Sequence, residues 1–135
     1  MMDFEIREYI CYKRDEVLAL YESVGWTGYT CRFDIMEQAF AQSLKIYGAY
    51  VQDQLVGLVR AVGDGLTIVY IQDLLVHPAY QRMGIGKALL GRILEDYQAV
   101  YQKVLTTDDT EKTRAFYHHM GMKVDTEIGC RVFMC

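Results

Sequence analysis

The feature that most restricts the fold of this chain is the segment 71–94, IQDLLVHPAYQRMGIGKALLGRIL. An apolar run typical of a buried strand ends at Val76, and a short loop follows that holds the chain's single proline, Pro78. Beyond the loop, apolar residues share one stripe at helical spacing: Ile85, Leu89, Ile93 and Leu94. The segment therefore predicts a strand, a glycine-containing loop and an amphipathic helix in direct succession.

The loop Gln81–Gly86 has the properties of an anion-binding turn. The first turn of a helix has backbone N–H groups without partners, and the helix dipole adds partial positive charge there. Gly84 and Gly86 let a ligand approach that backbone closely, and Arg82 and Lys87 add full charges. These features predict a cradle for a pyrophosphate, although two glycines can also simply open a tight strand-to-helix turn.

Two common phosphate loops do not fit this segment. A Walker A loop requires Ser or Thr after the Gly-Lys pair, and Ala88 follows Lys87 here. A dinucleotide-binding fingerprint requires a third glycine, and Leu89 occupies that position.

The remaining elements follow from apolar periodicity and turn residues. Strands are expected at 3–10, 46–52, 55–62, 66–76, 100–106, 122–127 and 130–134. Helices are expected at 13–24, 34–44, 84–97 and 109–120, with Asp34 as the cap of the second. The long run 66–76 reads as a central strand buried on both faces. The order β-α-α-β-β-β-α-β-α-β-β predicts an α/β chain with a mixed sheet and helices on both faces.

Composition fits one domain, 1–135, with an ordinary share of 52% hydrophobic and 24% charged residues. The chain has no apolar run long enough to cross a membrane, and its charged start lacks the apolar core of a signal peptide. A cytoplasmic protein is therefore expected, with its four cysteines reduced and without a zinc site, since no cysteine neighbours a histidine. A net charge of −4 argues against a nucleic-acid partner.

Residues 71–90 resemble the acetyl-CoA segment of the GNAT acetyltransferase superfamily, in small single-domain bacterial form. The matching positions are Leu74, Val76, Pro78, Gln81, Gly84, Gly86, Leu89 and Leu90. A second stretch, TEKTRAFYHHMGM (110–122), keeps the family's Phe116, Tyr117 and Gly121. Thr110, Thr113 and Met122 depart from that second pattern, which puts a cofactor contact at position 110 in doubt.

The resemblance implies a GNAT fold, with a mostly antiparallel twisted sheet of six to seven strands, and acetyl-CoA as the cofactor. In this family the fourth and fifth strands splay apart and the pantetheine arm lies between them. The implied cofactor-binding residues are Leu74, Leu75, Val76, Gln81, Arg82, Met83, Gly84, Ile85, Gly86, Lys87 and Ala88. An N–H near Leu75 or Val76 would stabilise the tetrahedral intermediate. Tyr117 matches the tyrosine that protonates the departing thiolate, with packing against the cofactor as the alternative.

Several carboxylates are candidates for the base that deprotonates the amine. Asp73 is the leading candidate, beside Glu37 and Asp108 or Asp109, and each is also an ordinary structural or solvated carboxylate. Leu105 stands where relatives that modify peptide N-termini have a glutamate, which argues against that route. The pair His118-His119 is expected to face solvent, because adjacent helical residues point in different directions.

The expected acceptor site is the aromatic connection 24–29, which holds Trp26 and Tyr29. Aromatic rings can pack an aromatic amine or stack on a cation, so an aralkylamine-like small molecule is the expected substrate, unless Trp26 is a core residue between helices. A peptide acetyltransferase and a non-catalytic acyl-CoA sensor are the alternatives. A homodimer is expected from the family and from the apolar segment CRVFMC at the end of the chain.

Overall fold

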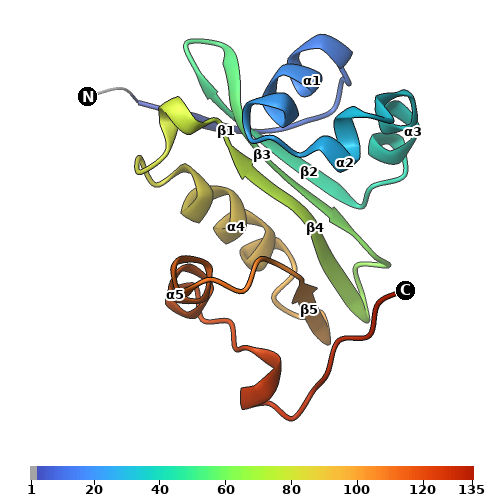
Figure 1. Ribbon diagram of the computed structural model, residues 1–135, viewed down its shortest axis with the longest axis vertical. Coiled ribbons are helices and arrows are strands. Elements are labelled where there is room, and N and C mark those ends of the chain that lie inside the picture. The colour runs from blue at the N-terminus through green and yellow to red at the C-terminus, as the bar shows by residue number, and fades with distance from the viewer. Residues whose placement is uncertain (1–2) are drawn as a thin grey trace. The chain divides into compact units, whose positions relative to one another are not determined.

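The computed structural model describes residues 3–135, in two compact parts that meet in sequence between Leu105 and Thr106. Figure 1 shows the course of the chain through both. The expectation of a single domain stays a prediction.

The first part contains one sheet with the strands in chain order, β1-β2-β3-β4-β5. The strands are β1 (Glu5–Glu8), β2 (Lys45–Val51), β3 (Gln54–Val62), β4 (Ile68–Val76) and β5 (Gln102–Leu105). Neighbouring strands are antiparallel except for β4 and β5, which are parallel. Gln52 and Asp53 join β2 to β3 with positive φ angles of 50° and 64°, as a tight hairpin turn requires.

Helices cover both faces of this sheet, as the sequence predicts (Figure 1). Three helices lie on one face: α1 (Arg14–Ser23), α2 (Thr27–Thr30) and α3 (Met36–Ala41). Their apolar residues Val17, Leu20, Met36 and Phe40 form one buried cluster with Leu58 and Leu75 of the sheet. Nowhere along residues 3–135 is a helix long and apolar enough to span a membrane.

The other face carries α4 (Ile85–Asp96), whose buried stripe is Ile85, Leu89, Leu90 and Ile93. This helix packs very close to the sheet at Gly57 of β3. A Cβ atom on Gly57 would lie 3.0 Å from Ile85 Cγ2 and 3.3 Å from Leu89 Cδ1. The glycine therefore lets α4 pack directly on the backbone of β3, and this fixes the start of the helix beside the end of β4.

The second part contains α5 (Glu111–His119) and a 3-10 turn at Asp125–Glu127. Thr110 caps α5: its hydroxyl accepts the N–H of Thr113 at 3.2 Å. Gly121, with φ 87°, follows the helix as the sequence predicts.

Three predictions about these elements are wrong. Residues 122–127 and 130–134 are not strands, so the sheet has five described strands and not six or seven. A segment with apolar alternation forms a strand only where a neighbouring strand pairs with it. Val132, Phe133 and Met134 are exposed instead. Asp34 does not cap a helix but lies in a 3-10 turn, Phe33–Ile35, ahead of α3.

Strand β4 is also not buried on both faces. Val69, Ile71, Asp73 and Leu75 are buried, while the residues between them are half-buried or exposed. A run of β-branched and leucine residues hides this alternation, because Ile68, Leu74 and Val76 are apolar yet only half-buried.

We predict that Leu89→Ala lowers the free energy of unfolding by about 2–5 kcal/mol, because Leu89 is fully buried between α4 and β3. Urea unfolding followed by circular dichroism measures this difference. Glu95→Ala, an exposed position on the same helix, should change stability by less than about 0.5 kcal/mol. Equal effects of both substitutions would contradict the assigned burial of α4.

Candidate active site

Strand β4 has one edge that is only half paired. On that edge β5 pairs with Ile68–Ile71 and ends at Leu105, opposite Ile71. The other edge is paired to β3 as far as Val76. The backbone from Gln72 to Val76 therefore lies beyond the last β5 partner. A strand edge of this kind presents backbone groups to which an extended ligand can bind, although the Val76 carbonyl oxygen already accepts from Gln81 Nε2. Leu74, Leu75 and Val76, predicted to bind the cofactor, all fall within this open stretch.

A β-bulge sits where the pairing with β5 stops. Asp73 is opposite Arg60 of β3 and Ile71 is opposite Ala61, so Gln72 is an extra residue in β4. A bulge re-aims the side chains of its strand. Here Gln72 and Asp73 both reach Tyr29 of α2, on the same face of the sheet.

The loop after β4 is held by its own side chains. His77 Nδ1 accepts the N–H of Ala79 at 3.1 Å, at the start of a 3-10 turn formed by Pro78–Tyr80. Gln81 Nε2 donates to the carbonyl oxygen of Val76 at 3.2 Å. This bond returns the loop to the end of β4, so Gln81 shapes the loop through its side chain.

Helix α4 begins with unpaired donors. Its first intrahelical bond runs from the Ala88 N–H to the Gly84 carbonyl at 3.0 Å. The N–H groups of Ile85, Gly86 and Lys87 precede that bond and have no acceptor within the helix. Gly84 has φ 84°, and a Cβ placed on it would meet no atom within 4 Å. The start of the helix is open, positively polarised and flanked by exposed Arg82 and Lys87, which suits a pyrophosphate. Half-buried Met83 lies between Arg82 and Gly84.

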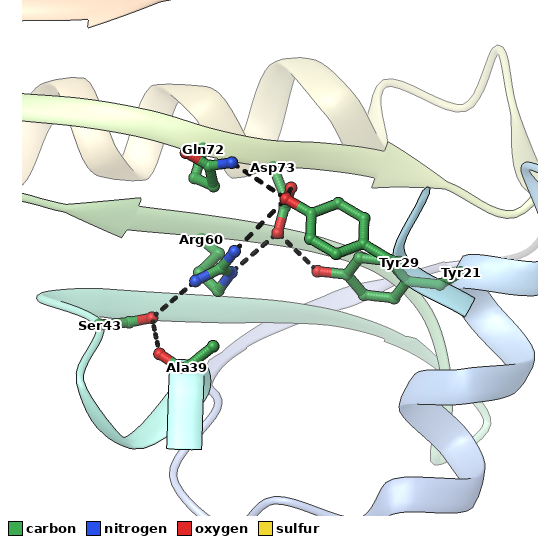
Figure 2. Close-up of polar contacts among 7 residues, drawn as sticks. All are labelled: Tyr21, Tyr29, Ala39, Ser43, Arg60, Gln72 and Asp73. Carbon is green, nitrogen blue, oxygen red and sulfur yellow. Dashed lines mark hydrogen bonds and ion pairs between the residues drawn. The ribbon is translucent and has the colours of Figure 1, made fainter. Parts of the chain in front are cut away.

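Asp73 is the centre of a buried hydrogen-bond network (Figure 2). Its Oδ2 accepts from Arg60 Nε and from the Tyr21 hydroxyl, each at 2.8 Å, and its Oδ1 accepts from the Tyr29 hydroxyl at 2.6 Å. Asp73 is 2% and Arg60 5% exposed. Burial and the Asp73 charge together raise the pKa of Tyr21 well above its usual range. Asp73 is thus a buried carboxyl group that pairs with a guanidinium and accepts three hydrogen bonds.

The network continues away from Asp73 on the other side of Arg60. Arg60 Nη1 donates to Ser43 Oγ at 3.3 Å, and Ser43 in turn donates to the Ala39 carbonyl at 2.8 Å. Within the described residues 3–135, every buried side-chain nitrogen and oxygen has a hydrogen-bond partner. The arrangement is therefore complete, as a buried polar network must be to avoid a large desolvation cost.

The predicted acceptor residues lie on and beside this network. The Trp26 ring packs edge-on against Tyr21 at 5.9 Å and lies 6.2 Å from Tyr29 at a shallow angle. Trp26 and Tyr29 are both half-buried. Each side chain therefore contributes to packing and still presents part of its surface to solvent.

Tyr117 lies on α5, in the second part of the chain. Its side chain is half-buried and its ring packs edge-on against Phe116 at 5.0 Å. Burial raises the pKa of Tyr117, and a hydrogen bond with Thr107 opposes that shift. Tyr117 is therefore a protonated phenol at neutral pH, the form that an acid requires.

The other candidate bases are exposed carboxylates: Glu37, Asp108 and Asp109. Asp109 forms an ion pair with Arg114. His118 pairs with Glu127 through Nε2 at 2.7 Å, and His119 is exposed, so both face solvent as predicted.

Sequence reasoning missed Arg60 and Gln72, and it placed Tyr21 beside the aromatic connection but not in contact with Asp73. A signal for the first was present: Arg60 is the only charged residue in the apolar strand LVGLVRAV, and Asp73 is the only one in IVYIQDLLV. Two opposite charges in two adjacent buried strands indicate an ion pair, because an unpaired buried charge is too costly. Gln72 has no such signal, because a bulge is not visible in the sequence.

Residues 9–122 match the family model described as the acetyltransferase (GNAT) family. The chain therefore belongs to the GNAT acetyltransferase family. A solved GNAT-family acetyltransferase, SP0256 from Streptococcus pneumoniae TIGR4, is 40% identical with a TM-score of 0.90 over 98% of this chain and 97% of that one.

Two more distant similarities add to this. An uncharacterised ycf52-like N-acetyltransferase from Prochlorococcus marinus is 34% identical over 82% of this chain and 62% of that protein. The chain thus spans about three fifths of the length of this curated relative. The PaiA N-acetyltransferase of Thermoplasma acidophilum, solved in complex with coenzyme A, shares the fold with a TM-score of 0.69 and 18% identity, over 91% of each chain.

We predict that Asp73→Ala destabilises the fold by about 3–5 kcal/mol, because it leaves Arg60 buried without its counter-charge and two tyrosine hydroxyls without an acceptor. The double variant Arg60→Met, Asp73→Leu removes both charges and should lose less than Asp73→Ala alone. Urea unfolding of the variants measures both losses. A larger loss in the double variant would contradict the assignment of a buried ion pair.

Proposed function

We propose that this protein is an acetyl-CoA-dependent N-acetyltransferase that acts on a primary amine of a small molecule in a ternary complex. One observation carries the proposal: the open edge of β4 at Gln72–Val76 leads directly into the open, donor-rich start of α4 at Gly84. An extended arm that ends in a pyrophosphate matches that succession of backbone groups.

The residues present suit acetyl-CoA. The backbone of Leu74–Val76 would pair with the pantetheine amides, and the N–H groups from Arg82 to Lys87 would bind the pyrophosphate. Gln81 would keep the loop in shape through its bond to Val76, and Ala88 would close the first helical turn. A protein of the same fold is in complex with coenzyme A, which supports this assignment. Bound acetyl-CoA would supply the activated acyl group as a thioester.

The chain's own groups would then serve the transfer. A neutral amine would attack the acyl carbon, and an N–H of Leu75 or Val76 would stabilise the oxyanion that forms. Tyr117 would give its proton to the departing thiolate, and its raised pKa keeps the phenol protonated at neutral pH until that step.

Proton abstraction by Asp73 stays a prediction, and its contacts support a different role. Three donors occupy the carboxylate, and Arg60 stabilises its charged form. We propose that Asp73 positions Tyr29 and with it the acceptor loop. The amine would then lose its proton to water, with the exposed carboxylates Glu37, Asp108 and Asp109 as the remaining candidate bases.

Trp26 and Tyr29 would contact the acceptor, since both are half-buried aromatic residues, at the start of α2 and within it. They lie on the face of the sheet where Gln72 and Asp73 reach Tyr29. An aralkylamine-like acceptor fits rings of this kind. We also propose that the protein is cytoplasmic and forms a homodimer. The successive apolar residues Val132, Phe133 and Met134 are exposed, which supports a partner at that segment.

The cofactor site is tested first by calorimetric titration with acetyl-CoA. We predict that Gly84→Glu lowers acetyl-CoA affinity at least tenfold, because a carboxylate would stand among the donors that bind the pyrophosphate. Gly129→Glu is the matched control: Gly129 also has a positive φ, 70°, and open space at its Cβ position, but lies away from the cradle in sequence. The acetyl-CoA affinity of Gly129→Glu should stay at the wild-type value.

A folded wild type that does not bind acetyl-CoA would contradict the proposed function at its root. Binding without turnover on phenethylamine, tryptamine, putrescine or a lysine-containing peptide would favour a non-catalytic acyl-CoA sensor. Acetylation of the peptide alone would favour a peptide acetyltransferase.

We predict that Tyr117→Phe lowers kcat about a hundredfold and leaves acetyl-CoA affinity unchanged, because only the proton donor is lost. In the wild type, kcat/KM for the amine should rise from pH 7 to pH 9, since the neutral amine increases while Tyr117 stays protonated. Steady-state kinetics over this range measure both effects. A fall in wild-type kcat/KM between pH 7 and pH 9 would argue against a tyrosine acid.

A further inference from the structure

The hydrogen bonds around Tyr29 have directions that can be assigned from chemistry. Arg60 is always protonated, and its 2.8 Å ion pair keeps Asp73 ionised in the buried network. An ionised carboxylate only accepts hydrogen bonds. The single proton of the Tyr29 hydroxyl is therefore donated to Asp73 Oδ1, at 2.6 Å.

This assignment fixes the orientation of the Gln72 amide. Because Tyr29 has given its proton to Asp73, its oxygen can only accept from Gln72, so the group that faces it at 3.0 Å is Nε2. Arg60 Nη2, at 3.5 Å, approaches the same oxygen as a second donor. The charges of one buried ion pair thereby determine which end of an exposed amide faces outward.

The outward end is the amide oxygen Oε1 of Gln72. Within residues 3–135, which the structure describes, the Gln72 amide bonds to Tyr29 through Nε2, and Oε1 accepts no hydrogen bond. Gln72 is exposed, and it is the bulge residue at the point where β5 leaves the edge of β4. The site thus presents a fixed, unoccupied hydrogen-bond acceptor beside the open stretch of backbone.

We propose that Gln72 Oε1 binds the acceptor amine by accepting one of its N–H groups, which makes Gln72 a specificity-determining residue. This inference rests on the proposed N-acetyltransferase function. A primary amine has two N–H donors and one lone pair, so a bond to one N–H orients the amine and leaves the lone pair free to attack. The Tyr29 hydroxyl is then a positioning group for the amine nitrogen, since it acts on that nitrogen through Gln72, while the Tyr29 ring would contact the rest of the acceptor.

A neutral side chain at position 72 suits the binding of a neutral amine better than a carboxylate would. A carboxylate at position 72 would favour the protonated ammonium, which cannot attack, and it could not donate to Tyr29. A neutral amide oxygen favours the ammonium less than a carboxylate would, can accept an N–H of the neutral amine, and keeps the bond to Tyr29. The choice of glutamine here is therefore consistent with a site that takes the amine in its reactive form.

The test compares steady-state kinetics of wild type, Gln72→Met and Tyr29→Phe with the best amine from the panel above. Gln72→Met keeps side-chain length but removes both amide groups, and we expect amine KM to rise about tenfold while calorimetric acetyl-CoA affinity stays constant. Tyr29→Phe frees the amide to rotate, and we expect a smaller rise. In the double variant the rise should equal that of Gln72→Met alone, since phenylalanine keeps the ring that would contact the acceptor and the lost hydroxyl acts on the amine only through Gln72.

Gln54→Met, at an exposed glutamine that begins β3, is the matched control and should leave amine KM unchanged. A wild type that acetylates the amine while Gln72→Met shows an unchanged amine KM would overturn this inference and leave the proposed function standing. Independent, additive effects of Gln72→Met and Tyr29→Phe would also overturn it. A wild type that binds acetyl-CoA but acetylates no amine would overturn the proposed function and this inference together.

Discussion

The ion pair between Arg60 and Asp73 is the interaction on which the site depends. It joins β3 to β4 at the bulge, with Nε and Oδ2 separated by 2.8 Å and both side chains nearly fully buried. Two charges are buried at a high desolvation cost, which their mutual attraction and further hydrogen bonds offset. Tyr21 and Tyr29 donate to the carboxylate, and Ser43 accepts from the guanidinium. Three separate segments are thereby fixed around one point of the sheet.

The second constraint is the short length of β5. It pairs with four residues of a nine-residue β4, so more than half of one β4 edge has no strand beside it. Exposed strand edges are normally a liability, because they can pair with other chains. Here the unpaired stretch ends at Val76, and α4 begins at Ile85 after one loop. A ligand with amides and a pyrophosphate can bind both the strand edge and the start of the helix. The same incompleteness of the sheet that exposes backbone thus creates the proposed cofactor site.

Local features were predictable from the sequence, and long-range ones were not. The hairpin between β2 and β3, the Gly84 turn and the stripe of α4 depend on neighbouring residues, so periodicity and turn residues indicate them. The sequence predicts the hairpin turn at Asp53-Gln54, and the structure has it one residue earlier, at Gln52-Asp53. The Tyr21–Asp73 contact joins residues 52 positions apart, and the bulge at Gln72 depends on register with another strand. The predicted strands 122–127 and 130–134 fail for a related reason: alternation shows which face is apolar but not whether a partner strand is present.

The role of Asp73 follows from the same network. To act as a base, Asp73 would have to take up a proton, and at that moment the charge that balances Arg60 would be lost in a buried place. The new O–H would also need an acceptor, while the three groups that contact the carboxylate already donate to it, so protonation would oppose the contacts that hold Tyr29. A carboxylate that must stay ionised to maintain the fold is suited to orient other groups. It orients Tyr29 directly, and through Tyr29 it orients the amide of Gln72, which carries the effect of a buried charge to the surface where the amine would bind.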